Sequence, residues 1–201
     1  MRTFMLSFGL CLLLAACVPT PDVQPAAAPS GQYTLDKSHA SLILRLSHSG
    51  GLSLFTARFD DFDAILDFNP DAPEQSRLSV VIEAASINTG MADFDRKLAG
   101  TKNLLDAKAH PQIRFISSAI TRTGPQDGKV TGILTLRGVS QPITLDVHFN
   151  GSARDPLRRA QVIGFSADGH FSRQAFGANA WSAFGVGDEI VVHIEAEFLK
   201  T

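Results

Sequence analysis

The chain has 201 residues, of which 44% are hydrophobic and 19% are charged, and its net charge is -2 at neutral pH. This length suits one domain or two small ones, and this composition is typical of a globular protein and not of a disordered chain. No basic stripe appears, which argues against a nucleic-acid partner. Phenylalanine is over-represented, at 14 residues against one Trp and one Tyr, which favours a Phe-rich interior or a Phe-lined pocket.

The N-terminus is typical of a secretory signal. Arg2 precedes thirteen mostly apolar residues, "FMLSFGLCLLLAA", a run too short to span a bilayer. The "LAAC" at 14–17 resembles a bacterial lipobox, which predicts cleavage after residue 16 and lipid attachment at Cys17. The alternative is an ordinary signal peptide cut near Ala16 with an incidental cysteine. The residue after the cysteine is Val18 and not the aspartate that often retains such lipoproteins at the inner membrane. The resemblance to that sorting pattern favours the outer membrane, on the periplasmic side, in a bacterial envelope.

The division that we predict is 1–16 signal peptide, 17–31 lipidated cysteine and tether, and 32–201 folded domain. Residues 18–31, "VPTPDVQPAAAPSG", contain four prolines and little that could build a core. At ~3.1 Å per residue such a tether reaches roughly 40 Å. Because Cys11 leaves with the signal, Cys17 is the only cysteine of the mature chain, which excludes an intramolecular disulfide and a thiol metal site.

Alternating apolar and polar residues predict about eight strands in the folded part. The runs are "LILRLS", "FDAILDF", "RLSVVIEA", "IRFISSAI", "KVTGILTLRG", "ITLDVHFN", "VIGFSADGHF" and "EIVVHIEAEF". Turn signals between them are Asp127-Gly128, Gly138, Asn150-Gly151 and the segment 185–188. Mostly consecutive strands with such short links favour an antiparallel sheet, closed into a barrel or packed as a sandwich.

One segment, around residues 90–109, has helical spacing instead. Met91, Phe94 and Leu98 would share a helix face, with Thr89 as a possible N-cap and Gly100 at the end. A second short helix would start near Thr101.

The sequence offers few groups for chemistry. It has neither a G-x-S-x-G elbow nor a phosphate-binding loop of the G-x-x-x-x-G-K-[ST] type. His148, His170 and His193 fall on the polar side of their strands, as solvated surface histidines do, so we predict no metal site. We likewise predict no catalytic residue and no cofactor.

Several stretches together resemble the YceI-like family of lipid- or polyisoprenoid-binding proteins. They are "YTLDKSHASL", "ARFDDFDAILDF", "SINTG", "AKAHPQIRF", "GILTLRGVSQPITLDV" and "FSRQAFG", spread over 33–198. The resemblance implies an all-β, antiparallel, eight-stranded lipocalin-like barrel around an apolar tunnel, with polyisoprenoid or fatty-acid-like ligands. The chain departs from the family pattern in three places: Phe94 to Leu98, which includes Lys97, then Leu104-Leu105, and the loop after His48. All three lie where we expect the tunnel entrance.

In that fold the inward faces of the strands would line the ligand space. The predicted lining residues are Leu42, Leu44, Leu46, Phe59, Phe62, Ala64, Leu66, Phe115, Leu134, Leu136, Phe165, Ala167 and Ile194. Each has an alternative role as plain core, because an eight-stranded barrel is just wide enough either to be filled or to hold one small ligand.

Three functions therefore compete. The first is a lipid-anchored protein that carries or sequesters a long-chain isoprenoid or fatty-acid-like lipid and meets the membrane through acylated Cys17. The second is a filled-barrel interaction module of the envelope, and the third is a lipid-modifying enzyme. The sequence leaves open the lipid, the choice between transport and storage, and the oligomeric state, with a homodimer among the alternatives.

Overall fold

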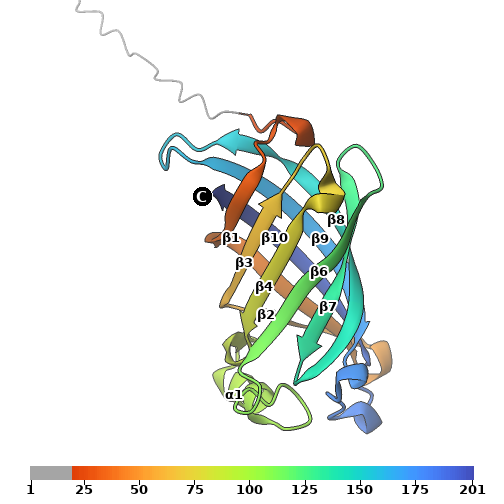
Figure 1. The fold of residues 1–201 in the computed structure, drawn as a ribbon. Coiled ribbons are helices and arrows are strands. Elements are labelled where there is room, and N and C mark those ends of the chain that lie inside the picture. Colours follow the sequence, from red (N-terminus) through yellow and green to blue (C-terminus); the bar gives the residue numbers. More distant parts are fainter. Residues whose placement is uncertain (1–19) are drawn as a thin grey trace, which may run out of the picture.

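The alternating segments form one sheet that winds up and down around a single axis (Figure 1). The computed structural model describes residues 20–201, so the predicted signal and Cys17 lie outside the described part. The strands are β1 (Gly31–His48), β2 (Ser53–Phe59), β3 (Phe62–Phe68), β4 (Arg77–Glu83), β5 (Ile87–Asn88), β6 (Gln112–Arg122), β7 (Asp127–Leu136), β8 (Val139–Arg154), β9 (Gln161–Ser172) and β10 (Glu189–Lys200).

The sheet closes because its last strand pairs with its first. The order is β10-β9-β8-β7-β6-β4-β3-β1-β2-β5, and β10 also pairs with β1, all antiparallel. β2 and β3 pair with opposite ends of β1 and so share one position in the wall. The result is the predicted closed barrel of eight antiparallel strands, with β5 as a short extra pairing on β2.

The helical insertion is confirmed, with one helix instead of two. The α-helix is α1 (Ala92–Gly100), and the short 3-10 turns are η1 (Pro25–Ala27), η2 (Ser49–Gly51), η3 (Pro73–Gln75), η4 (Ala84–Ser86), η5 (Gln174–Phe176) and η6 (Ser182–Phe184). Thr89 is not the N-cap: its N–H and hydroxyl both donate to Asp95 Oδ1, at 2.7 and 2.6 Å. Residues 101–109 form turns, pinned where Ala107 N–H donates to Ala99 O.

Ordered structure begins before Gln32, where we expected the fold to start. Asp22 and Ser152 exchange two backbone hydrogen bonds of 2.7 Å, so this part of the predicted tether extends the sheet at β8. Ala28 is 2% exposed, and Tyr33 Oη donates to Pro29 O at 2.6 Å. Burial of Ala28 and the backbone pairing of Asp22 therefore dock this proline-rich segment on the barrel, although it has no strand pattern of its own.

Two predicted turns are wrong. Asn150-Gly151 lies inside β8, at a bulge between the pairs Phe149–Phe165 and Gly151–Gly164, and the chain turns only at 155–160. Gly151 has φ +141°, and a Cβ there would stand 2.9 Å from the Pro21 side chain, so the glycine admits the docked N-terminal segment. Asp127-Gly128 begins β7, because the Thr123 and Gly124 N–H groups donate to Asp127 O and place the turn earlier.

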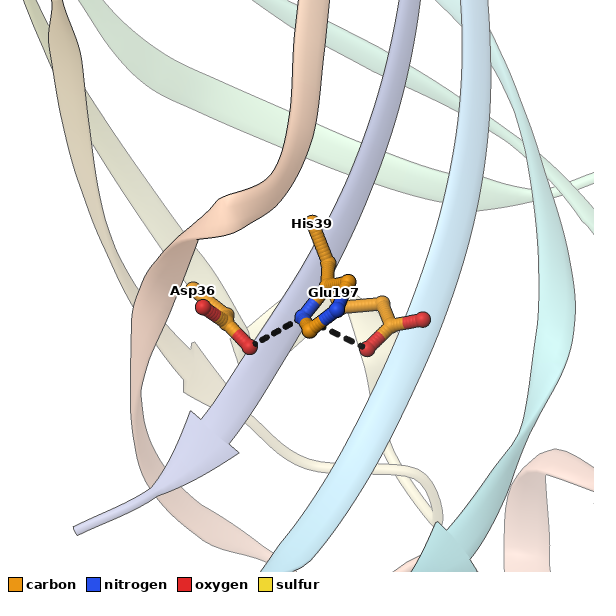
Figure 2. Close-up of side chains that lie close together, drawn as sticks. All are labelled: Asp36, His39 and Glu197. Atoms are coloured by element: carbon orange, nitrogen blue, oxygen red, sulfur yellow. Dashed lines mark hydrogen bonds and ion pairs between the residues drawn. The ribbon is translucent and has the colours of Figure 1, made fainter.

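A wide irregularity interrupts β1. Leu35 pairs with Phe198 and Ala40 with Ala196, so the four residues 36–39 stand opposite the single residue Glu197 of β10. The segment bends outward and carries Asp36 and His39 (Figure 2). The even alternation of a strand cannot be extended through such a bulge.

Aromatic side chains cluster on the inner face of the barrel near the N-terminal end of β1. Phe68, Phe149 and Phe165 contact one another with ring centroids 5.4–6.3 Å apart, and Tyr33 meets Phe68 edge-on. Across residues 20–201 no helix combines the length and the apolar character that a bilayer crossing needs.

Candidate ligand-binding site

The barrel encloses a cavity of about 360 Å³ whose wall is almost entirely apolar. This volume lies in the range of pockets that hold small molecules. The structure places all thirteen predicted residues on the cavity wall: Leu42, Leu44, Leu46, Phe59, Phe62, Ala64, Leu66, Phe115, Leu134, Leu136, Phe165, Ala167 and Ile194. Arg45, between two of these leucines, is exposed outside, as the alternation predicts.

The mouth of the cavity lies at the β6–β7 hairpin. Of the residues that line the cavity, the exposed ones are Thr121, Arg122, Pro125 and Asp127, and all belong to this hairpin. Three further prolines complete the rim: Pro25 of η1, Pro73 of η3, and Pro70 shortly before η3. Figure 1 shows these segments together at one end of the barrel. Proline has a fixed φ, so the rim is stiff.

The opposite end is closed around Arg173, which is 5% exposed. Its guanidinium donates to the carbonyl oxygens of Ala178, Ala180, Val186 and Gly187 and to the Ser182 hydroxyl. These contacts use all five donors of the side chain. Burial lowers the pKa of Arg173, and the nearby Asp188 opposes that change. Arg173 therefore organises the 173–188 loop and has no donor left for a ligand.

A second arginine joins the loops of the closed end. Arg137, with Gly138, forms the tight turn between β7 and β8, and both residues have positive φ, 55° and 74°. The Arg137 guanidinium donates to Phe176 O and Lys102 O, which belong to two different loops. Leu98, Leu104 and Leu105 line the cavity beneath these loops.

The predicted location of the entrance is therefore wrong. All three departures from the family pattern lie at the closed end, in α1, in the turns after it and in the loop around η2 (Figure 1). There Phe94 stacks on Trp181, with ring centroids 5.9 Å apart, and Lys97 Nζ lies 5.1 Å from the Trp181 ring. The unusual residues of this chain seal the barrel instead of framing its opening.

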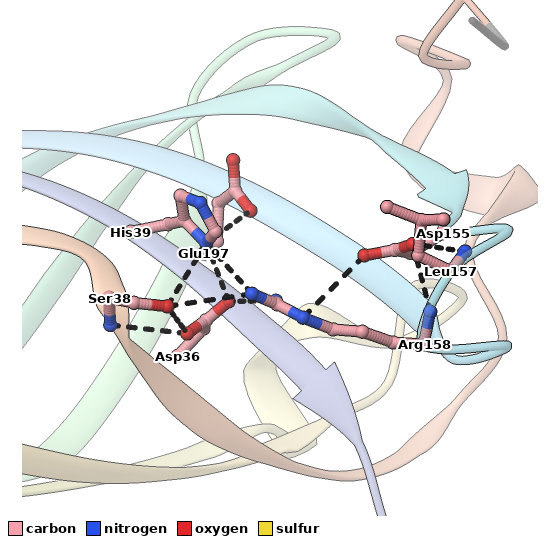
Figure 3. A network of polar contacts seen from close by, with 7 residues as sticks. All are labelled: Asp36, Ser38, His39, Asp155, Leu157, Arg158 and Glu197. Atoms are coloured by element: carbon pink, nitrogen blue, oxygen red, sulfur yellow. Dashed lines mark hydrogen bonds and ion pairs between the residues drawn. The ribbon is translucent and has the colours of Figure 1, made fainter.

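A polar network outside the barrel connects the β1 bulge to the β8–β9 hairpin (Figure 3). Asp36, 7% exposed, accepts from Arg158 and from the Ser38 hydroxyl, and its Oδ2 lies 2.7 Å from His39 Nδ1. Burial alone would raise the pKa of Asp36, but the hydrogen bonds from His39, Ser38 and Arg158 together hold it well below its usual range. The hydrogen bond to Asp36, with its charge, raises the pKa of His39.

Asp36, His39 and Glu197 bring three potential metal ligands within 4.8 Å of one another (Figure 2). Arg158 already neutralises Asp36, so the cluster is organised as an ion-pair network. Two of the surface histidines also have acidic neighbours: His148 Nδ1 lies 2.7 Å from Asp127 Oδ1, and His193 Nδ1 lies 2.8 Å from Asp168 Oδ1. His170 is exposed, as expected.

The closed antiparallel barrel with an apolar cavity and one polar rim has the architecture of a lipocalin-like barrel. The model of the YceI-like domain matches residues 33–198, and the chain belongs to that family. This confirms the resemblance that the sequence motifs indicated.

Known relatives agree with this assignment. A UPF0312 protein of Pseudomonas savastanoi is 34% identical over 146 residues, which cover 72% of this chain and 75% of that protein. A Campylobacter jejuni YceI protein has 32% identity and a TM-score of 0.68, covering 75% of this chain and 87% of that one. BcnA of Burkholderia cenocepacia reaches a TM-score of 0.72 at 24% identity, covering 81% and 98% of the two chains, and so shares the fold.

Sequence reasoning missed Arg173, Arg158 and the Asp36 network. Arg173 stands in a turn-rich segment where an arginine is normally solvated, and only the surrounding carbonyl groups reveal its burial. The spacing of Asp36 and His39 could have indicated a pair on one side of a tight bend, but Arg158 is 122 residues away from Asp36.

Proposed function

We propose that the protein binds a long-chain amphiphile, polyisoprenoid or fatty-acid-like, inside the barrel and carries or sequesters it at the bacterial envelope. The observation that carries this proposal is the gradient along the cavity, from exposed polar residues at the mouth to an apolar wall and a closed end. An amphiphile would place its tail against the wall and its polar head near Arg122 and Gln126 at the rim.

Burial of the tail is a sufficient driving force. Each CH₂ group contributes ~0.8 kcal/mol when it leaves water, so ten buried carbons give roughly 8 kcal/mol before the ordering of the ligand is subtracted. A Saccharophagus degradans domain described as polyisoprenoid-binding has the same fold, with a TM-score of 0.65, at 15% identity. That likeness supports a barrel of this type as a container for such tails.

We infer binding without catalysis. Apart from Arg173, the charged residues on the cavity wall, Arg122 and Asp127, stand at the mouth in contact with solvent. A tail inside the barrel would meet leucine, isoleucine, valine and phenylalanine side chains, which cannot transfer protons or act as nucleophiles.

We further propose that Cys17 is the acylated N-terminus of the mature protein and anchors it to the periplasmic face of the outer membrane. Its position after an apolar run of thirteen residues supports this. Cys17→Ala should leave the chain uncleaved or release it from the membrane fraction. Intact-mass data that show another N-terminus without an acyl mass would contradict the anchor.

The binding proposal is tested by native mass spectrometry and lipid extraction of protein purified in mild detergent. A stoichiometric long-chain lipid is the expected result. Conversion of that lipid during incubation would indicate an enzyme instead. A barrel that carries no lipid and accepts none from added polyprenyl phosphate or fatty acid would overturn the proposal.

A further inference from the structure

The first described residues run along the open end of the barrel. Asp22 is held on β8 by its two backbone hydrogen bonds with Ser152, and Pro25 of η1 stands on the rim of the cavity. Figure 1 shows η1 at the same end as the β6–β7 and β8–β9 hairpins. The chain therefore enters the folded domain beside the mouth.

The reach of the chain brings this end close to a membrane. Asp22 follows Cys17 by five residues, and a fully extended chain spans at most ~3.6 Å per residue, or roughly 18 Å here. This step rests on the proposed acylation of Cys17. With that anchor, Asp22 stays within about 18 Å of the lipid headgroups, whatever path the intervening residues take, and Ser152 is hydrogen-bonded to it.

The loop of the β8–β9 hairpin follows Arg154, two residues after Ser152. Its side chains are of the kinds that bind a bilayer surface. Leu157 at its tip is 93% exposed, and Arg154 and Arg159 on either side of it are exposed. Within residues 20–201 neither of these arginines forms an ion pair. An apolar side chain between cations suits the boundary between headgroups and acyl chains of an anionic membrane.

Hydrogen bonds within the turn organise the tip. Asp155 Oδ1 accepts from the N–H groups of Leu157 and Arg158, at 2.8 and 3.1 Å, so the nearest acid is turned onto its own turn. Arg158 points to Asp36 in the β1 bulge (Figure 3). These contacts leave Leu157 projecting away from the barrel.

We propose that Leu157, Arg154 and Arg159 dock the β8–β9 hairpin on an anionic phospholipid surface and so hold the cavity mouth toward the bilayer. The acyl anchor fixes the distance of this end from the membrane, and the hairpin fixes its orientation. A lipid tail then passes between bilayer and cavity over a short path at the proline rim.

A single-site fluorophore tests the docking in the full acylated protein. Acylation of the Cys17 sulfur leaves the cysteine of Leu157→Cys as the only free thiol of the mature chain. An environment-sensitive label there is compared with the same label in Leu52→Cys, since Leu52 is 88% exposed at the closed end. Proteins are reconstituted into vesicles of phosphatidylcholine with phosphatidylglycerol, with and without a lipid-borne quencher, and floated on a density gradient.

The expected result is a blue-shifted emission and several-fold stronger quenching at position 157 than at position 52. Protein that floats with both labels in water overturns the docking but leaves the anchor intact. Protein that does not float overturns the anchor and the docking together, while lipid binding is measured separately by native mass spectrometry. A label at 157 that is shielded only in native envelopes indicates a protein partner and overturns the proposal.

Charge reversal tests the contribution of the two arginines to docking separately from that of Leu157. Arg154→Glu with Arg159→Glu should weaken quenching at position 157 several-fold in anionic vesicles and have little effect in pure phosphatidylcholine. The matched control is Lys102→Glu with Lys108→Glu, two exposed lysines at the closed end, which should leave the signal unchanged. Equal losses in both pairs would show a general charge effect and contradict docking through the hairpin.

Discussion

The two ends of the barrel are built by different means. The closed end is fixed by hydrogen bonds from Arg173 to its own loop and from Arg137 to two distant loops, and by α1 and its aromatic contacts. The open end is framed by prolines and by a hairpin whose exposed residues also line the cavity. In this barrel, hydrogen bonds to loop carbonyl groups hold the loops across one end, and no such buried donor holds the described loops of the other end across the cavity.

The largest effect is expected from the arginine of the closed end. Arg173→Met removes the donors of five buried or half-buried acceptors, and each acceptor left unsatisfied in the interior costs ~1–3 kcal/mol. We expect the free energy of unfolding, measured in urea, to fall by roughly 3–5 kcal/mol, less than the full sum because the loop relaxes. The matched Arg122→Met at the mouth should change it by less than about 0.5 kcal/mol. Equal losses of stability in Arg173→Met and Arg122→Met would contradict the difference between the two ends.

The space between the ends is tested by filling it. Ala64 on β3 and Ala167 on β9 point into the cavity and are small where their neighbours are large. We expect at least one of Ala64→Trp and Ala167→Trp to keep a near-normal urea midpoint and lose most of its bound lipid, because the indole takes the ligand's volume. In a filled interior the same change would overpack the core and lower the free energy of unfolding by ~1–3 kcal/mol or more.

The outward-facing Ala119→Trp on β6 is the control for these variants and should affect neither stability nor lipid. If both inward variants unfold readily, the barrel is filled at those positions. If both stay folded and still carry lipid, the ligand binds elsewhere.

A smaller effect is expected from pH, through histidines that pair with carboxylates on the outside of the barrel. The pKa of His39 is raised in the folded state, so its contribution is complete below its unfolded pKa of about 6.5 and is lost as pH rises through the folded value. The pKa of Asp36 is lowered, so its contribution is lost only in acid, below about pH 4. The melting temperature should therefore fall between pH 6 and 8.5.

His39→Gln should flatten part of that decline. His193→Gln should remove a separate part, since the hydrogen bond to Asp168 raises the pKa of His193 in the same direction. The Arg173 cluster at the closed end does not titrate in this range. A wild-type melting temperature that is constant or rises from pH 6 to 8.5 would contradict the assigned role of His39.

The smallest effect is expected from a chelator. Asp36, His39 and Glu197 lie close enough to bind a metal, but Asp36 is already paired with Arg158. The group is therefore an ion-pair network. Thermal melts with and without chelator should coincide. A drop of several degrees that one particular metal reverses would identify the open end as a metal site.

The sequence by itself determined the number of strand positions, their antiparallel order and the residues that face the interior. This was possible because strand alternation is a local property: Leu42, Leu44 and Leu46 point inward once β1 is extended. The motifs shared with the YceI-like family then indicated the barrel and its cavity. Local signals were enough wherever the regular geometry of a strand was not interrupted.

Only the tertiary structure decided which end is open and what closes the other. Asn150-Gly151 resembles a turn but lies at a bulge that Pro21 approaches, and the bulge at 36–39 stands opposite Glu197 and is bonded by Arg158. The burial of Arg173 depends on carbonyl groups of a folded loop. Each of these features requires groups that are distant along the chain, or a backbone path that side-chain pattern does not encode, and so no local pattern could have revealed them.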